Sequence, residues 1–208
     1  MSSCQTNYTR GKTILASRVI AELEGSADRQ VVFFYFKRDD PLRDSHIAML
    51  KGLLAQVIRI SPELLPYVYE EVSASLERVL GSPETLMMLL ETAFGAIEQL
   101  WMVLDGLDEC EKKERKKILS WISKITSEGS PVHVQVFVTS QDKMDIQQAI
   151  SSFSRCPTIS LQEPSHQDDI RTYVSRKAAK RKQQFDLPME IEQDIVHKVT
   201  RHANGMLC

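Results

Sequence analysis

The clearest indication of the fold of this chain is the segment Leu100-Trp101-Met102-Val103-Leu104-Asp105-Gly106-Leu107-Asp108-Glu109-Cys110. Its first half is continuously apolar, and an acidic cluster that contains a glycine follows directly. A continuous apolar run bounded by a turn signal is typical of a strand buried on both faces of a parallel sheet. The stretch therefore predicts a central strand that ends at Asp105, in an α/β fold built around a parallel sheet.

Acidic side chains cluster at the expected carboxyl end of this strand, where open α/β sheets bind their ligands. A carboxylate at the position of Asp105 is suited to hold Mg²⁺ on the phosphates of a nucleotide. Asp108 and Glu109 follow where a base that activates water could sit. The competing interpretation is a buried strand followed by a solvated acidic turn, because short motifs also occur by chance.

A second motif, Gly11-Lys12-Thr13, stands at the start of an amphipathic helix. Gly-Lys-Thr at a helix start is the second half of a phosphate-binding loop. Backbone N–H groups and the helix dipole attract phosphates, Lys12 adds a mobile positive charge, and the Thr13 hydroxyl can bind Mg²⁺. The full pattern has a further glycine where this chain has Thr6, and a buried strand that residues 1–10 do not supply. Taken alone, the motif fits a lysine near the start of a solvated helix equally well.

The rest of the chain alternates between short apolar runs and longer amphipathic segments, which predicts parallel strands connected by helices. Further strands are expected at residues 31–36, 132–140 and 158–161. Further helices are expected at residues 43–60, 63–79, 84–99, 111–127, 166–185 and 188–203. Gln141 follows the strand at 132–140, where a polar side chain could reach a γ-phosphate.

Composition narrows the functional class. Hydrophobic residues make up 42% of the chain and charged residues 26%, and the net charge of -2 gives no field that would recruit nucleic acid or an anionic membrane. The four cysteines have no metal-ligand or redox spacing, and neither zincin-type histidine pairs nor a nucleophile-elbow serine occurs. There is no apolar run of membrane-spanning length and no signal-peptide core, so we expect a cytoplasmic protein. The basic run at residues 176–182 is interpreted as a solvated face, because it lacks interleaved aromatic residues.

Taken together and in this order, the motifs resemble those of a NACHT-type P-loop NTPase of the STAND signalling class, and within it the nephrocystin-type NACHT modules abundant in fungi. The resemblance extends from residue 11 to residue 208. The residues that carry it are Gly11-Lys12-Thr13, 33–36, 105–109, 136–140, Asp169-Ile170 with Tyr173, and 203–206. It implies a three-layer sandwich of the additional-strand type, with a parallel sheet in the order 5-1-4-3-2. The implied domains are an irregular tail at 1–10, a P-loop NTPase core at 11–162 and a helical extension at 163–208.

The resemblance also implies the roles of single residues. Gly11 and Lys12 would bind the phosphates of ATP or GTP. Thr13 would contact Mg²⁺, and Asp105 would hold the metal through water. Asp108 or Glu109 would polarise the attacking water. Members of the family typically act as nucleotide-dependent signalling switches. The expected partners are therefore nucleotide and, through flanking domains, further copies or other proteins, but neither nucleic acid nor membrane.

The chain departs from the family pattern at Thr6, at the missing first strand, at Gln141 in place of arginine, and at its end. The missing strand would lie beside the strand at 132–140, and its loss would leave backbone ladder groups unpaired there. We therefore expect a truncated chain, a gap at that place, and slow hydrolysis or none. The alternatives are a degenerate, non-hydrolysing interaction or oligomerisation module of the same family and, third, nucleic-acid binding through residues 176–182.

Overall fold

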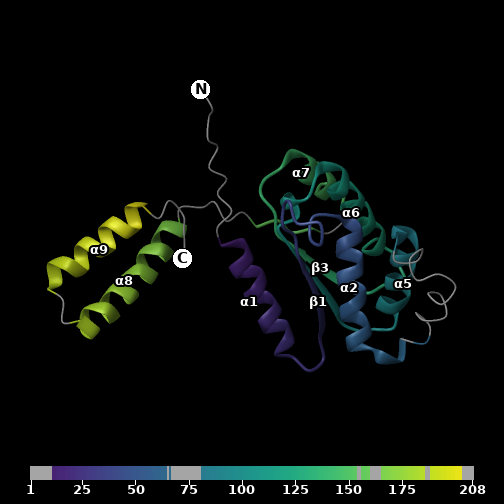
Figure 1. Cartoon of the computed structure of the whole chain (residues 1–208), viewed down its shortest axis with the longest axis horizontal. Coiled ribbons are helices and arrows are strands. Elements are labelled where there is room, and N and C mark those ends of the chain that lie inside the picture. The colour runs from purple at the N-terminus through teal and green to yellow at the C-terminus, as the bar shows by residue number, and fades with distance from the viewer. Residues whose placement is uncertain are drawn as a thin grey trace. The chain divides into compact units, whose positions relative to one another are not determined.

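The computed structural model describes residues 11–64, 66, 81–153, 156–159, 165–185 and 188–202. The chain divides into two compact units. One unit comprises residues 12–156, and the other includes the two C-terminal helices; each is described by itself (Figure 1).

A parallel sheet of three strands organises the larger unit. The strands are β1 (Gln30–Tyr35), β2 (Leu100–Asp105) and β3 (Val134–Val138), in the order β1-β2-β3. Tyr35 is opposite Asp105, and Leu104 is opposite Val138, so the three strands end at the same edge. The predicted α/β class, the parallel sheet and the central strand that ends at Asp105 are confirmed. The strand order agrees with the 4-3-2 part of the expected sheet.

Helices cover both faces of this sheet (Figure 1). On one face, α2 (His46–Ile60), α5 (Pro83–Gly95) and α6 (Lys112–Ile125) pack over the main apolar core. On the other face, α1 (Lys12–Glu24) buries a smaller cluster through Ala16, Ile20 and Leu23. Successive strand side chains point to opposite faces, so Val32 and Phe34 join the first cluster while Val31 and Phe33 join the second. The unit is a three-layer α/β sandwich.

Local sequence sets where two of these helices begin. Ser45 caps α2, because its side chain accepts a hydrogen bond from the Ala48 N–H. Ser82 caps α5 in the same way, and Pro83 occupies the first turn, where its missing N–H costs nothing. Within α2, Gly52 allows close packing on the sheet, since a Cβ there would lie 3.0 Å from the Phe34 ring.

The outer edge of β1 is closed by a side chain. The Phe33 N–H donates to Gln56 Oε1 at 2.9 Å, and Gln56 Nε2 donates to the Phe33 carbonyl at 2.8 Å. Gln56 on α2 thus replaces a neighbouring strand at one position of this edge, with which no strand of the described residues pairs. This contact limits pairing of the edge with other chains.

Some expected elements differ from the observed ones. β3 begins at Val134 and ends at Val138, so it is shorter than the predicted strand at 132–140. Thr158 and Ile159 lie in no strand, which corrects the first half of the predicted strand at 158–161; the second half lies outside the described residues. The predicted helix at 63–79 also falls largely outside them, apart from the short helix Pro62–Leu64. Within the described ranges, no strand pairs with the second edge of β3.

The second unit contains α8 (Ser165–Phe185) and α9 (Met189–His202), at the two positions predicted for the last helices. The two helices contact each other, and Lys182 Nζ lies 3.1 Å from Glu192 Oε2 between them. Val174 and Ala178 of α8 are buried. In the part of the chain that the structure describes, no helix is long and apolar enough to cross a membrane.

Candidate functional site

The turn after β2 brings the predicted acidic residues back to the sheet edge. Gly106 follows Asp105 with φ +75°, a left-handed conformation that favours glycine. A Cβ at this position would lie 3.4 Å from the Phe36 carbonyl oxygen. The turn continues as the short helix η2 (Leu107–Glu109), which carries Asp108 inward.

Asp105 joins the two sequence motifs. Its carboxylate is buried at the end of β2, with 4% of the residue exposed. Oδ2 accepts a hydrogen bond from the Thr13 hydroxyl at 2.7 Å, and Oδ1 accepts one from the Thr139 hydroxyl at 2.5 Å. The first turn of α1 and the end of β2 are therefore in direct contact, although 92 residues separate Thr13 from Asp105.

Asp108 lies deeper, with 1% of its side chain exposed. Its Oδ1 accepts a hydrogen bond from the Gln141 backbone N–H at 2.7 Å, and Lys12 Nζ lies 3.6 Å from the same oxygen. Its Oδ2 is buried and has no hydrogen-bond partner among the described residues. The structure thus brings together Lys12, Thr13, Asp105 and Asp108, and Gln141 contributes its backbone rather than its side chain.

The other two predicted site residues, Glu109 and Gly11, form no side-chain contact with this cluster in the described part of the chain. Glu109 is partly exposed on η2, and no described side chain forms a hydrogen bond or ion pair with it. Gly11 directly precedes α1 with φ +105°, again a conformation that favours glycine. Residues 6–10, the remainder of the expected phosphate-binding loop, lie outside the described residues.

Two arginines that are not among the predicted site residues form hydrogen bonds with the backbone of the acidic turn. Arg115 Nη1 donates to the carbonyls of Cys110 and Asp108, and its Nε lies 2.9 Å from Asp145 Oδ2. The hydrogen bond from Arg115 lowers the pKa of the Asp145 carboxyl. Arg38 Nη2 also donates to the Asp108 carbonyl, at 3.4 Å.

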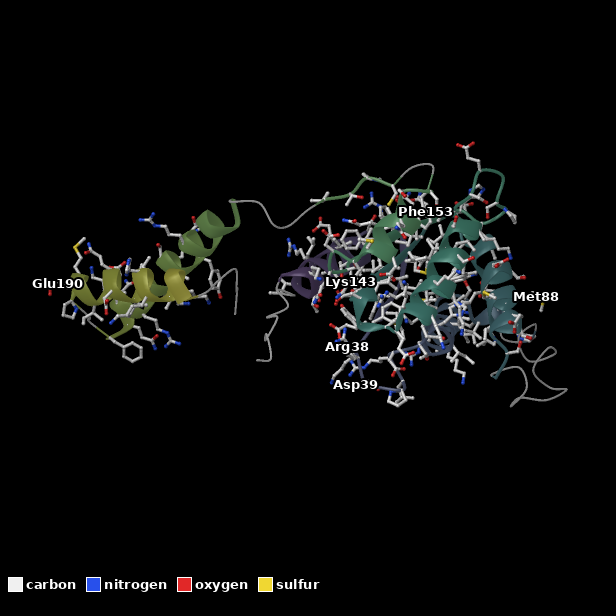
Figure 2. The ribbon with its side chains drawn as sticks, turned by 90° about the horizontal axis from the view of Figure 1, so that it is seen from above. Arg38, Asp39, Met88, Lys143, Phe153 and Glu190 are labelled. Atoms are coloured by element: carbon white, nitrogen blue, oxygen red, sulfur yellow. The ribbon has the colours of Figure 1, made fainter. Side chains whose placement is uncertain are left out.

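The loops after β1 and β3 lie at the same end of the unit. Figure 2 shows Arg38 and Asp39 from the first loop on the side where Lys143, which precedes α7 (Met144–Ile150), is also found. This is the edge at which the three parallel strands end, and α1 begins there as well because Thr13 contacts Asp105.

The donor set fits Mg²⁺. Thr13 and Asp105 offer oxygen atoms 2.7 Å apart, and Mg²⁺ prefers oxygen ligands. Asp108 Oδ2 also fits a site that binds a polar ligand. Buried polar atoms are normally hydrogen-bonded, and this oxygen has no partner among the described residues. In the described ranges, no group of three or more His, Cys, Asp or Glu side chains could hold a metal. Such a site suits Mg²⁺ bound through one or two carboxylates and the phosphates of a ligand, rather than through an all-protein cage.

Comparisons with known proteins cover this whole site. The family model described as "Nephrocystin 3, N-terminal" matches residues 3–141. The vegetative incompatibility protein HET-E-1 of Podospora anserina is 22% identical over 206 residues, which is 94% of this chain and 15% of that protein. The chain therefore spans only a small part of this curated relative. A solved structure of a Walker-type ATPase from Pyrococcus abyssi aligns with a TM-score of 0.44 and 14% identity, over 92% of this chain and 64% of that one.

Proposed function

The chain belongs to the family of nephrocystin 3 N-terminal domains, as its motifs predicted, and on this premise we propose that residues 12–156 form an Mg²⁺-dependent, nucleotide-binding switch module. The ligand is ATP or GTP. The module is of the P-loop NTPase type, and its hydrolysis is slow or absent.

The observation that carries this proposal is the contact between Thr13 and Asp105. Thr13 lies in the first turn of α1, where unpaired backbone N–H groups and the helix dipole favour a phosphate. Asp105 lies at the carboxyl end of the central strand, where α/β sheets bind ligands. Their oxygen atoms lie 2.7 Å apart, and the ammonium group of Lys12, the residue before Thr13, lies 3.6 Å from Asp108 Oδ1. This arrangement supports phosphate binding by Lys12 and Mg²⁺ binding by Thr13 and Asp105.

Bound Mg²⁺ would neutralise negative charge on the phosphate oxygens. The chain's own residues supply the rest. Lys12 would bind the β- and γ-phosphates, and the Thr13 hydroxyl and Asp105 carboxylate would position the metal. Asp108 Oδ1 is held by Gln141 and Lys12. The Glu109 side chain is partly exposed and has no hydrogen-bond or ion-pair partner among the described residues. Of the two candidate bases, Glu109 is therefore the one that can orient a water molecule. The burial of the other, Asp108, supports slow turnover at most.

A fluorescent ATP or GTP analogue titrated into the full chain, with Mg²⁺ and with EDTA, tests the proposal by fluorescence anisotropy. We expect saturable binding that Mg²⁺ strengthens. Lys12→Met should weaken binding in both conditions, because it removes the phosphate contact. Lys51→Met, on the exposed face of α2, is the matched control and should leave binding unchanged. Absence of saturable, Mg²⁺-dependent binding in the unaltered chain would contradict the proposal.

The second candidate is a non-hydrolysing interaction or oligomerisation module of the same family. The observation that favours it is the burial of Asp108, because its side chain is only 1% exposed and its Oδ1 is engaged by Lys12 and the Gln141 N–H. Turnover that disappears in Asp105→Ala would exclude it. We further propose that the protein self-associates or binds other proteins, and that it is located in the cytoplasm.

A further inference from the structure

Thr139 stands directly after β3, and its backbone is fixed to the end of β2. Its N–H donates to the Leu104 carbonyl at 2.9 Å, and its own carbonyl accepts from the Leu107 N–H at 3.0 Å. Only 6% of the residue is exposed. Because hydrogen bonds hold the backbone on both sides of the Asp105 turn, the position of the Thr139 side chain is set by the sheet itself.

The Thr139 hydroxyl both donates and accepts a hydrogen bond. It donates its proton to Asp105 Oδ1 at 2.5 Å and accepts the Gly106 N–H at 3.0 Å. A hydroxyl has a single proton to donate. Because Thr139 donates its hydrogen bond to Oδ1, the carboxylate is oriented so that its other oxygen, Oδ2, faces Thr13.

We propose that Thr139 is a positioning residue for metal binding: it acts through Asp105, and holds Oδ2 toward Thr13 in the orientation that Mg²⁺ requires. This inference rests on the proposed nucleotide and Mg²⁺ site. Outer partners that hydrogen-bond to a ligating carboxylate fix its orientation, and their loss weakens metal binding even though they never touch the metal. Thr139 follows β3 whereas Asp105 ends β2, so the constraint is a tertiary contact between residues far apart in the sequence.

A purely structural role predicts a different outcome. If the hydroxyl only stabilised the fold, its loss would lower stability and weaken every mode of nucleotide binding together. A positioning role affects the Mg²⁺-dependent part of binding alone, because Lys12 and the N-terminus of α1 bind phosphate without Asp105. The two roles are separated by comparing nucleotide affinity with Mg²⁺ and with EDTA.

The test uses Thr139→Val, which keeps the shape of the side chain and removes the hydroxyl, and Thr139→Ser, which keeps the hydroxyl. Thr126→Val is the matched control, because it makes the same substitution at a threonine away from the site. The Thr126 hydroxyl donates to the Ile122 carbonyl near the end of α6. Affinity for a fluorescent ATP analogue is measured on the full chain with Mg²⁺ and with EDTA. We expect Thr139→Val to lose roughly tenfold or more in Mg²⁺-dependent affinity and nothing in EDTA. Thr139→Ser and Thr126→Val should retain the Mg²⁺ enhancement.

Unchanged Mg²⁺ enhancement in Thr139→Val, or an equal loss in both conditions, would overturn the inference. The unaltered chain is measured first: if it shows no Mg²⁺-dependent binding, the proposed function has failed and this inference fails with it. A thermal melt followed by circular dichroism accompanies each variant. If Thr139→Val is unfolded, Thr139→Ala replaces it in the same titration, since it places no methyl group against the carboxylate.

Discussion

Lys12 Nζ lies 3.6 Å from Asp108 Oδ1, and this ion pair connects the start of α1 to the acidic turn after β2. The carboxylate is almost fully buried, while 14% of the Lys12 side chain remains exposed. A buried carboxylate depends strongly on its partner charge. Lys12 is also the group expected to bind phosphate, so an incoming phosphate must compete with Asp108 for the same ammonium group.

Asp108→Asn should therefore tighten nucleotide binding in EDTA, by roughly tenfold or about 1.4 kcal/mol. The substitution keeps the acceptor for the Gln141 N–H and removes the charge that retains Lys12. Isothermal titration calorimetry with ATP checks it. In a Lys12→Met background the same change should give no gain. Asp40→Asn, which removes a carboxylate paired with Arg43, is the control. Weaker binding by Asp108→Asn would show that Asp108 assists phosphate binding rather than competing with it.

Gln56→Ala should destabilise the larger unit by about 1–3 kcal/mol, because it leaves the Phe33 N–H and carbonyl without partners at the edge of β1. Urea unfolding followed by circular dichroism measures the change. Gln148→Ala on the exposed side of α7 removes an amide of equal size and should change the unfolding midpoint very little. Equal stability of the two variants would mean that solvent satisfies the β1 edge.

The burial of His46 leads us to expect that the folded chain loses stability in mild acid. Burial lowers the pKa of this imidazole below 6.5, and Glu114, Lys117 and Glu84 are the charged groups that act on it. Both ring nitrogens are buried without hydrogen-bond partners among the described residues. A histidine with a lowered pKa in the folded state takes up a proton more readily when the chain is unfolded. Its contribution to the free energy of unfolding is therefore complete above pH 6.5, and is lost as the pH falls from 6.5 through the folded pKa.

The measurement is the urea midpoint at neutral pH and at about one pH unit below 6.5, the unperturbed value of the imidazole. The unaltered chain should lose stability between the two. His46→Phe should reduce that loss, because it removes the group whose protonation differs between the folded and unfolded states. His133→Gln, at an exposed position, should leave the loss intact. The same acid sensitivity in His46→Phe would assign the effect to other groups.

Arg115→Lys should cost about 1–3 kcal/mol although it conserves the charge. A single ammonium group cannot bond the Asp145 carboxylate and the carbonyls of Asp108 and Cys110 together, as the guanidinium does. Arg18→Lys is the matched control, since Arg18 is an exposed residue of α1. Thermal unfolding of the two variants provides the comparison, and equal melting temperatures would show that Arg115 is not needed to hold the turn.

The sequence predicted those parts of the site that depend on chain order and strand direction. The apolar run that ends at Asp105 identified the central strand, and parallel topology then required Asp105 and the start of α1 to approach one edge. The resulting contact between Thr13 and Asp105 is observed at 2.7 Å. The inward position of Asp108 was not predictable, because it depends on the left-handed conformation of Gly106, which redirects the chain.

The missed features depend on tertiary geometry that a linear pattern does not contain. Thr139 reaches Asp105 because β3 is in register with β2, and Arg115 reaches the turn because α6 has one particular rotation over the sheet. A hydroxyl at the end of the strand next to the acidic one was the available signal for Thr139. The predicted strand at 158–161 rested on a short alternation that does not distinguish a strand from a loop, and Ile159 is 82% exposed.

Thr13 and Asp105 are proposed to complete an Mg²⁺-dependent nucleotide site at the start of α1. Calorimetric titration of ATP and of GTP into the full chain and into Asp105→Asn, each with Mg²⁺ and with EDTA, is the decisive measurement for this site. We expect saturable binding that Mg²⁺ strengthens in the unaltered chain, and loss of only that strengthening in Asp105→Asn. Equal affinity with and without Mg²⁺ in the unaltered chain, or full Mg²⁺ strengthening in Asp105→Asn, would contradict it.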